Sequence, residues 1–188
     1  MYEKMEITVN GVTPLIMHNG QLADPLNEYA KGVKVISAKR NKTESQFAEM
    51  GKLEWYGGLY LNDNRRVVIP GQNIEAALIA AAKKNKLGKQ FTAGMLSDGA
   101  WPLIYDGPKD VDKLWADGRF VDRRRVCISQ SSVMRCRPIF KTWSLSFTVH
   151  YLPDMLNPQQ VTEAVVICGR VIGLCDYVPK FGRFEIEK

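Results

Sequence analysis

The 188-residue sequence has no window near the roughly 20 uninterrupted apolar residues that a membrane-spanning helix needs. Its first residues, MYEKMEITVNGV, lack the basic and then apolar run of a secretory signal. It also has no internal repeat, no low-complexity tract and no long linker rich in Gly, Ser or Pro. These absences exclude a spanning helix and a repeat architecture, and we expect one soluble, cytoplasmic domain over residues 1–188.

Histidine and cysteine are scarce, with two and four residues respectively. A zinc site needs about four closely grouped Cys or His ligands, but His18 and His150 stand far apart and there is no C-x-x-C pair. The sequence also lacks a Ser-His-Asp set, a Walker loop and an H-E-x-x-H pair. We therefore expect no metal and no cofactor, and the evidence weighs against an enzyme. The expected state of the thiols is reduced and buried, at Cys127, Cys136, Cys168 and Cys175.

Positive charge, a formal net +6, is concentrated in two places. Between 119 and 141 a single acid, Asp122, faces seven basic residues: Arg119, Arg123, Arg124, Arg125, Arg135, Arg137 and Lys141. A second group, Lys83, Lys84, Lys86 and Lys89, follows a predicted helix. Such clusters supply the salt-sensitive attraction for phosphate that nucleic-acid binders use. The alternative is a solvated face that serves solubility.

Hydrophobic periodicity predicts the main elements. Alternation predicts strands over 5–18, ending or bending near Pro14, and over 143–151. Apolar residues at three- to four-residue spacing predict helices over 44–56, capped by Thr43, over 72–86, and over 157–173. The segment 19–43 is expected to be a loop with a helical turn near 25–31. Two short strands are expected on either side of a turn at Asn62-Asp63-Asn64, further strands at 101–105 and at 182–187, and a helical turn at 110–116. Two strands between 123 and 141 are expected to meet at a turn, Gln130-Ser131-Ser132.

Without its insertions the predicted order is β-α-β-β-α-β. The strands are 5–18, two within 123–152, and 182–187, and the helices are 72–86 and 157–173. This order is typical of an α+β, ferredoxin-like (RRM-type) fold, an antiparallel sheet with both helices on one face. We expect an insertion at about 19–66 and a protruding hairpin at about 123–141. RNA-recognition domains of this fold stack bases on the open sheet face.

Two segments are suited to bind phosphate. Pro70-Gly71 ends a strand, so the amides of 72–74 would form an exposed helix N-terminus, which attracts anions. Glycines at 169, 173 and 182, beside Lys180 and Arg183, could form a loop whose backbone approaches phosphate closely. A plain strand-to-helix turn and a plain glycine-rich helix end are the alternatives.

Three segments in order resemble one superfamily: VNGVTPLIMHNGQLADP, VVIPGQNIEAALIAAAKK and GRVIGLCDYVPKFGRFEIEK. They are similar to the repeat-associated mysterious proteins (RAMPs), which include CRISPR effector backbone subunits and guide-RNA processors. The sequence departs from that pattern after Pro-Gly, where Gln72 and Asn73 replace small hydroxyl residues, and its glycine-rich loop is longer. The chain is also shorter than most backbone subunits. The resemblance is therefore to a divergent or stand-alone member, such as one carried by a virus or mobile element.

The resemblance implies a protein that binds single-stranded RNA or DNA, RNA in preference, and oligomerises along the strand or joins a larger ribonucleoprotein. The hairpin, at 125–137, would act as a thumb over the strand. The residues expected to contact nucleic acid are Arg119, Arg123, Arg124, Arg125, Arg135, Arg137, Lys141, Lys83, Lys84, Gln72, Asn73, Lys180 and Arg183.

Two other functions stay open. The first is an interaction protein or inhibitor that mimics a backbone subunit and docks onto another complex. The second is an endoribonuclease that uses Asp24 in the loop after the first strand, with His18 as a secondary candidate. An Asp followed by Pro is also a common turn residue. Charge and stacking serve RNA and single-stranded DNA alike, so the sequence leaves that choice open.

Overall fold

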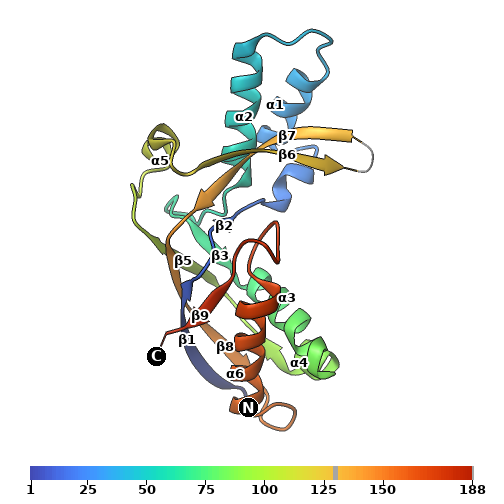
Figure 1. Cartoon of the computed structure of the whole chain (residues 1–188). Helices are drawn as coiled ribbons and strands as arrows, with labels where there is room; N and C mark the ends of the chain where they lie inside the picture. Colours follow the sequence, from blue (N-terminus) through green and yellow to red (C-terminus); the bar gives the residue numbers. More distant parts are fainter. Residues whose placement is uncertain (129–130, 188) are drawn as a thin grey trace.

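The computed structural model describes residues 1–128 and 131–187 and is a mixed α+β protein with antiparallel sheets (Figure 1). The strands are β1 (Glu3–Gly11), β2 (Leu15–Ile16), β3 (Val68–Pro70), β4 (Met95–Leu96), β5 (Ala100–Tyr105), β6 (Val121–Ile128), β7 (Ser131–Phe140), β8 (Trp143–Tyr151) and β9 (Phe184–Ile186). The helices are α1 (Glu28–Ser37), α2 (Glu44–Gly58), α3 (Gly71–Ala82), α4 (Gly88–Gly94), α5 (Val111–Asp117) and α6 (Pro158–Ile167). Short helical segments are η1 (Gly20–Ala23), η2 (Lys83–Asn85) and η3 (Cys168–Ile172).

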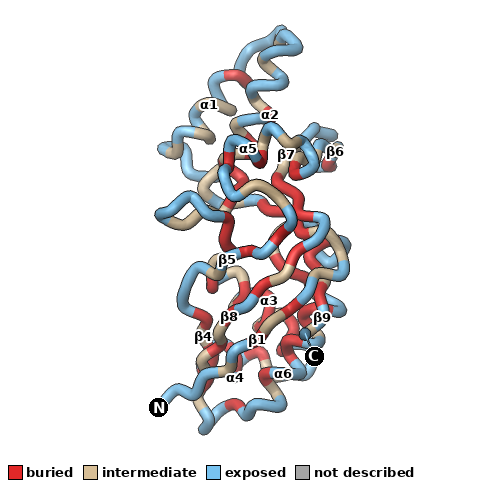
Figure 2. The backbone as a smooth tube through the Cα atoms, turned by 90° about the vertical axis from the view of Figure 1, so that its left-hand side faces the viewer, coloured by how far each residue is buried: buried red, intermediate tan, exposed pale blue. Residues whose placement is uncertain are grey.

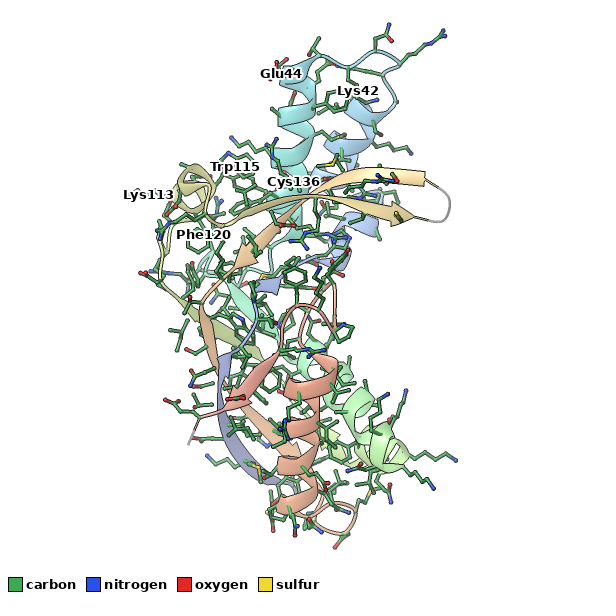
Figure 3. All side chains as sticks on the ribbon, in the orientation of Figure 1. Lys42, Glu44, Lys113, Trp115, Phe120 and Cys136 are labelled. Carbon is green, nitrogen blue, oxygen red and sulfur yellow. The ribbon has the colours of Figure 1, made fainter. Side chains whose placement is uncertain are left out.

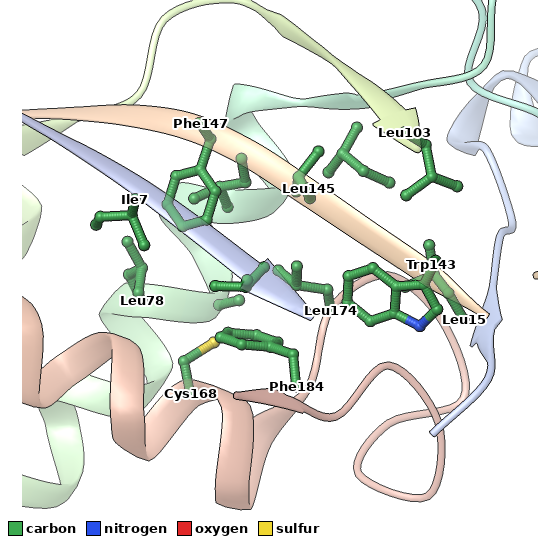
Figure 4. Close-up of a cluster of buried hydrophobic side chains, with 14 of the residues drawn as sticks. Ile7, Leu15, Leu78, Leu103, Trp143, Leu145, Phe147, Cys168, Leu174 and Phe184 are labelled. Atoms are coloured by element: carbon green, nitrogen blue, oxygen red, sulfur yellow. The ribbon is translucent and has the colours of Figure 1, made fainter. Parts of the chain in front are cut away.

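The main sheet has the order β3-β5-β8-β1-β9, with β4 also paired to β8. Strand β8 spans the predicted residues, and its alternation places Trp143, Leu145, Phe147, Val149 and Tyr151 in the core. Helices α3 and α6 cover this face of the sheet (Figure 1). Figure 4 shows the resulting core, in which Leu78 of α3 and Cys168 after α6 face Ile7 of β1 and Phe147.

The prediction that both inner strands come from 123–152 is wrong for the hairpin. Strand β8 pairs with β1 on one side and with β5 on the other, whereas β6 and β7 form a separate sheet with β2. Strand β5 supplies Leu103 and Tyr105 opposite Leu145 and Trp143, so it extends the apolar face that the helices bury. Strand β6, VDRRRVCI, carries charged residues on both faces and has no such apolar face.

The predicted strand over 5–18 is divided. Strand β1 ends at Gly11, where the indole of Trp143 lies so close that an added Cβ would stand 2.3 Å from its Nε1. The same Nε1 donates to the carbonyl of Thr13 at 2.8 Å. After Pro14 the chain re-enters a sheet as β2, which pairs with β7 instead of β8.

The predicted helices differ from the structure mainly at their ends. Helix α2 begins after Thr43, and a capping box with Gln46 confirms the predicted cap. The expected turn near 25–31 is the ten-residue helix α1, whose N-cap is Asn27. The helices predicted at 72–86 and 157–173 end earlier as α-helices and continue as η2 and η3. Helix α4 and the short β4 were not predicted. The predicted turn Gln130-Ser131-Ser132 falls partly on residues 129–130, outside the described chain, and β7 begins at Ser131.

A second lobe, formed by α1, α2, α5 and the β6–β7 hairpin, extends from the end of the main sheet (Figure 1). Aromatic side chains join it to the sheet: Trp55 of α2 packs edge-on against Trp115 of α5, and its Nε1 donates to the carbonyl of Phe120 at 2.8 Å. Phe120 in turn contacts Tyr105 and Phe140. Figure 2 shows that the far ends of α1 and α2 are largely exposed, whereas the base of the lobe is buried.

None of the helices within 1–128 and 131–187 combines the length and the apolar character that crossing a membrane would require.

Candidate nucleic-acid interface

The hairpin β6–β7 is held against α2 by one carboxylate. Glu54 is 6% exposed; its Oε2 accepts the Cys136 amide at 3.0 Å and its Oε1 accepts Nη1 of Arg135 at 2.6 Å. Strand β7 pairs with β2 only at 139–140, so its edge at Cys136 has no neighbouring strand there. Glu54 therefore supplies the acceptor that a missing strand would have supplied, and it fixes the hairpin on the helix at Cys136. Figure 3 labels Cys136 where the hairpin passes α2.

Four of the seven basic residues predicted in this region have acidic partners within the chain. Arg119 and Arg124 each donate two hydrogen bonds to the aspartate two residues earlier. The distances are 2.6 and 2.8 Å from Arg119 to Asp117, and 2.5 and 2.6 Å from Arg124 to Asp122. Arg135 pairs with Glu54, and Arg137 pairs with Asp176 at 3.2 Å. These arginines stabilise the hairpin, and their charge is largely neutralised before any ligand arrives.

Arg137 is the most buried of these cations, with a side chain 12% exposed. Its Nη1 lies within ion-pair distance of Asp176, but the angles do not make a hydrogen bond, and its Nε also has no partner within the described chain. The pair is therefore held by charge and by the Tyr177 ring, 6.0 Å from the guanidinium carbon. Arg124 lies over the neighbouring Phe181 ring at 4.4 Å. Together these contacts bind the inner face of the hairpin to the glycine-rich loop.

Arg123, Arg125 and Lys141 are exposed, and no acidic partner is found for them among the described residues. Arg123 and Arg125 alternate with Arg124 along β6, so both lie on the face toward α2. A hollow of about 230 Å³ on this face is lined by Arg123, by the ion pair of Glu54 and Arg135, and by apolar side chains that include Phe47 and Met134. Phe47 is 54% and Met134 60% exposed, so apolar surface lies beside the Arg123 guanidinium. We call this the hairpin face.

The glycine-rich loop joins segments that are far apart in the sequence. The Gly182 amide donates to the carbonyl of Pro14 at 2.8 Å, and the Asp176 amide donates to that of Ile16 at 3.0 Å. On the other side, Asn73 at the start of α3 contacts the sulfur of Cys175 at 3.9 Å. The three segments on which the family resemblance depends therefore meet in one region.

The glycines of this loop serve its own folding. Gly182 has φ +72°, and an added Cβ would stand 2.1 Å from the carbonyl oxygen of Leu174. The loop is closed at this point by the Leu174 amide, which donates to the carbonyl of Gly182 at 2.9 Å. Gly71 has a similar role at the start of α3, since its Cβ would lie 1.6 Å from the carbonyl oxygen of Ser97. The close neighbours of both glycines are protein backbone, so packing within the protein is by itself enough to require glycine at these positions.

A second hollow, of about 310 Å³, lies where these segments meet; its lining includes His18, Tyr60, Asn73, Cys175 and Asp176. Partial burial and the nearby Arg137 lower the pKa of His18 below its usual value, so this imidazole is more often neutral. Burial raises the pKa of Tyr60. We call this the junction hollow. It offers donors and one imidazole, and its one carboxylate, Asp176, is matched by Arg137.

The remaining predicted residues are scattered. Gln72 and Lys180 are exposed at the mouth of this region, and Nε of Arg183 donates to the carbonyl of Pro179 at 2.6 Å. Lys83 and Lys84 lie in η2 beside α4, in the lower half of the molecule and away from the hairpin (Figure 1). They form a second basic surface with Lys86 and Lys89, and do not extend the hairpin face.

Asp24 is exposed, and its Oδ1 accepts the Leu26 amide at 2.8 Å, the hydrogen bond of an Asx turn. No group of three His, Cys, Asp or Glu side chains within 1–128 and 131–187 is arranged to hold a metal ion. The geometry thus gives Asp24 a turn role.

The open face of the main sheet differs from that of RNA-recognition domains. Its residues on β1 and β8 are polar: Thr8 and Ser146, joined at 2.9 Å, with Ser144, Thr148 and His150. The exposed Ile104 of β5 is its largest apolar residue on these three strands, whose aromatic side chains all point to the core side. The described strands therefore offer no aromatic side chain on this face for bases to stack on, whereas RNA-recognition domains do.

Several residues that shape the site were not found by sequence reasoning. Asp117 and Asp122 stand two residues before the arginines they bind, a spacing that was visible in the sequence. Glu54 and Asp176 are 81 and 39 residues from their partners, which leaves no local signal. Tyr177 and Phe181 lie in the glycine-rich loop, and nothing near them in the sequence indicates that their rings contact Arg124 and Arg137.

Comparison with models of protein families finds no match, and comparison with curated proteins finds none either.

Proposed function

We propose that the chain binds single-stranded nucleic acid, RNA in preference, through the hairpin face. The observation that carries this proposal is that the exposed Arg123 lines a hollow with Phe47 and Met134, and that the exposed Arg125 is the cross-strand neighbour of Met134. Single-strand binders combine phosphate-contacting cations with apolar or aromatic surface on which bases pack. Lys141 adds charge at the base of the hairpin.

The proposed fold relationship is a ferredoxin-like one, with β1, β5, β8 and β9 as the four strands and α3 and α6 as the two helices. The order β9-β1-β8-β5, with the first and third of these strands paired at the centre, supports it. The meeting of the three resembling segments at the junction hollow supports a divergent relationship to the RAMP superfamily. Under this proposal a strand of RNA crosses the hairpin face toward the junction hollow, and copies of the protein assemble along it.

The decisive experiment measures binding of labelled single-stranded RNA and DNA to Arg123→Ala/Arg125→Ala by fluorescence anisotropy over a series of salt concentrations. Each phosphate contact on a single strand contributes about 0.7 to the slope of log K against log salt, so the variant's slope should fall by about 1.4. Lys86→Ala/Lys89→Ala removes equal charge from the second basic surface and is the matched control.

An unchanged slope in the hairpin variant would overturn the assignment of the hairpin face. Equal losses in both variants would mean that attraction is spread over the whole positive molecule. From the sequence alone, Arg135 and Arg137 are equally good candidates for this test. Their ion pairs make them unsuitable, because their removal would also disturb the hairpin.

A second candidate is the interaction protein. It is favoured by the internal neutralisation of Arg119, Arg124, Arg135 and Arg137, which leaves the hairpin less positive than its sequence suggests. It predicts no binding to either strand in the anisotropy experiment and a discrete complex with a protein partner whose surface carries acidic and apolar residues.

A further inference from the structure

We propose that two copies of this chain pair through the open edge of β1, with Lys4 of each copy opposite Glu6 of the other. This pairing needs no nucleic acid and is independent of the proposed function. It starts from an edge of the main sheet that β9 leaves uncovered. Strand β9 pairs only with Val9, Asn10 and Gly11, so it lies beside only the end of β1 remote from the N-terminus (Figure 1).

Two backbone hydrogen bonds define which backbone groups of β1 face that edge. The carbonyl of Thr8 accepts the Glu187 amide at 2.9 Å, and the Val12 amide donates to the carbonyl of Arg183 at 2.8 Å. The backbone N–H and C=O groups of the even-numbered residues of β1 therefore point toward the edge on which β9 lies. The register with β8 runs without interruption from Glu3 to Asn10, so the alternation has no bulge. The N–H and C=O groups of Lys4 and Glu6 therefore point to the open edge, where no described strand pairs with them.

The space beside this edge is sufficient for another strand. A hollow of about 410 Å³ is lined by Met5, Glu6, Ile7 and Thr8 of β1, by Thr162 of α6, and by the end of β9. The side chains of Lys4 and Glu6 are 68% and 73% exposed. A row of unpaired backbone groups next to such a space is a template for strand addition.

Charge identifies a second copy as the occupant. An antiparallel pairing must place even residues opposite even residues to form its hydrogen bonds. If Lys4 stood opposite Lys4, or Glu6 opposite Glu6, like charges would face each other. The register centred on Met5 places each Lys4 opposite a Glu6, which gives two hydrogen-bonded, oppositely charged pairs. In the single chain Lys4 and Glu6 form an ion pair with each other at 3.2 Å. In the dimer the two pairs between copies would replace this ion pair of each copy.

The same register is compatible with the end of β9. It places Glu3 of the second copy, the first residue of β1, opposite Ile7. The added strand therefore stops before Thr8, whose carbonyl already accepts the Glu187 amide, and Tyr2 of the second copy must turn away from the edge. The two Met5 side chains meet on the helix side, next to Thr162, whose hydroxyl lies 3.8 Å from the Met5 sulfur. A twofold contact of this kind closes at two copies.

Sedimentation analysis of nuclease-treated protein, from micromolar to near-millimolar concentration, tests the proposal. The wild type should form a dimer. Lys4→Glu should raise its Kd at least about tenfold, because two attractive pairs become repulsive, and the exchange Lys4→Glu/Glu6→Lys should restore it. Glu6→Pro removes the backbone donor at the edge and should abolish the dimer. The variant should still fold, since proline is tolerated on an edge strand. Lys89→Glu, with the same charge change elsewhere, is the control and should keep the wild-type Kd.

A wild type that stays monomeric over the whole range would overturn the proposal. So would a dimer whose Kd is unchanged by Lys4→Glu, or a charge exchange that fails to restore it. Circular dichroism of each variant separates loss of pairing from loss of folding, because the exposed Lys4 and Glu6 contribute nothing to the core.

Discussion

At the scale of single residues, Glu54 does more for the candidate interface than any arginine that the sequence suggested. Its carboxylate accepts the Cys136 amide at the free edge of β7 and also pairs with the Arg135 guanidinium. The exposed Arg123 and Arg125 are held in place because this buried carboxylate fixes β7, with which their own strand β6 is paired.

Replacing Glu54 by Ala should lower the free energy of unfolding by about 3 kcal/mol, because the Cys136 amide and the Arg135 guanidinium both lose their acceptor. Glu54→Gln keeps an acceptor for the amide and should lose less. Urea denaturation measures both. Equal stability of the Ala variant and the wild type would show that water replaces the carboxylate without loss.

At the scale of elements, the start of α3 shows why a sequence motif can be necessary without binding anything. Pro70-Gly71 was interpreted as a turn that exposes helix amides to an anion. In the structure the Gly71 amide donates to the carbonyl of Gly99 at 2.7 Å, and the backbone of Ser97 occupies the space that a side chain would need. Glu75 binds the Ser97 amide at 2.7 Å, which adds a negative charge to the first turns of the helix.

Gly71→Ala should therefore destabilise the protein by about 3 kcal/mol, because its Cβ can be accommodated only by moving backbone. Gly20→Ala is the matched control, since no atom lies within 4 Å of an added Cβ there, and its stability should stay near that of the wild type. Thermal unfolding followed by circular dichroism compares the two. A Gly71→Ala protein as stable as Gly20→Ala would show that β4 and α3 can separate freely.

At the scale of the whole molecule, one hydrophobic core connects the sheet, its two helices and the base of the second lobe. Three thiols report on the integrity of this core. Burial raises the pKa of Cys136 to about 11 and the pKa values of Cys168 and Cys175 to about 12. In the unfolded chain all three thiols would ionise at about 8.5, the ordinary pKa of cysteine.

The stability of the molecule should consequently fall as pH rises above about 8.5, because the unfolded state then binds fewer protons than the folded state. Below about 8.5 these thiols are protonated in both states and contribute no pH dependence. Urea denaturation in reducing buffer at a series of alkaline pH values measures the slope. Cys168→Ala removes one of the three groups and should make the slope shallower. A slope that stays the same in this variant would contradict the burial effect at Cys168.

The sequence by itself determined what local physics controls. The alternation over 143–151 fixed β8, and Thr43 and Asn157 fixed the starts of α2 and α6, because backbone pairing and capping depend on neighbours a few residues away. The concentration of arginine in the hairpin was equally visible. The strand that pairs with β8, the acids that neutralise Arg135 and Arg137, and the backbone that crowds Gly71 were decided only by the tertiary structure. Each depends on a contact between distant segments, and packing against a shared core selects such contacts in a way that no single stretch of sequence records.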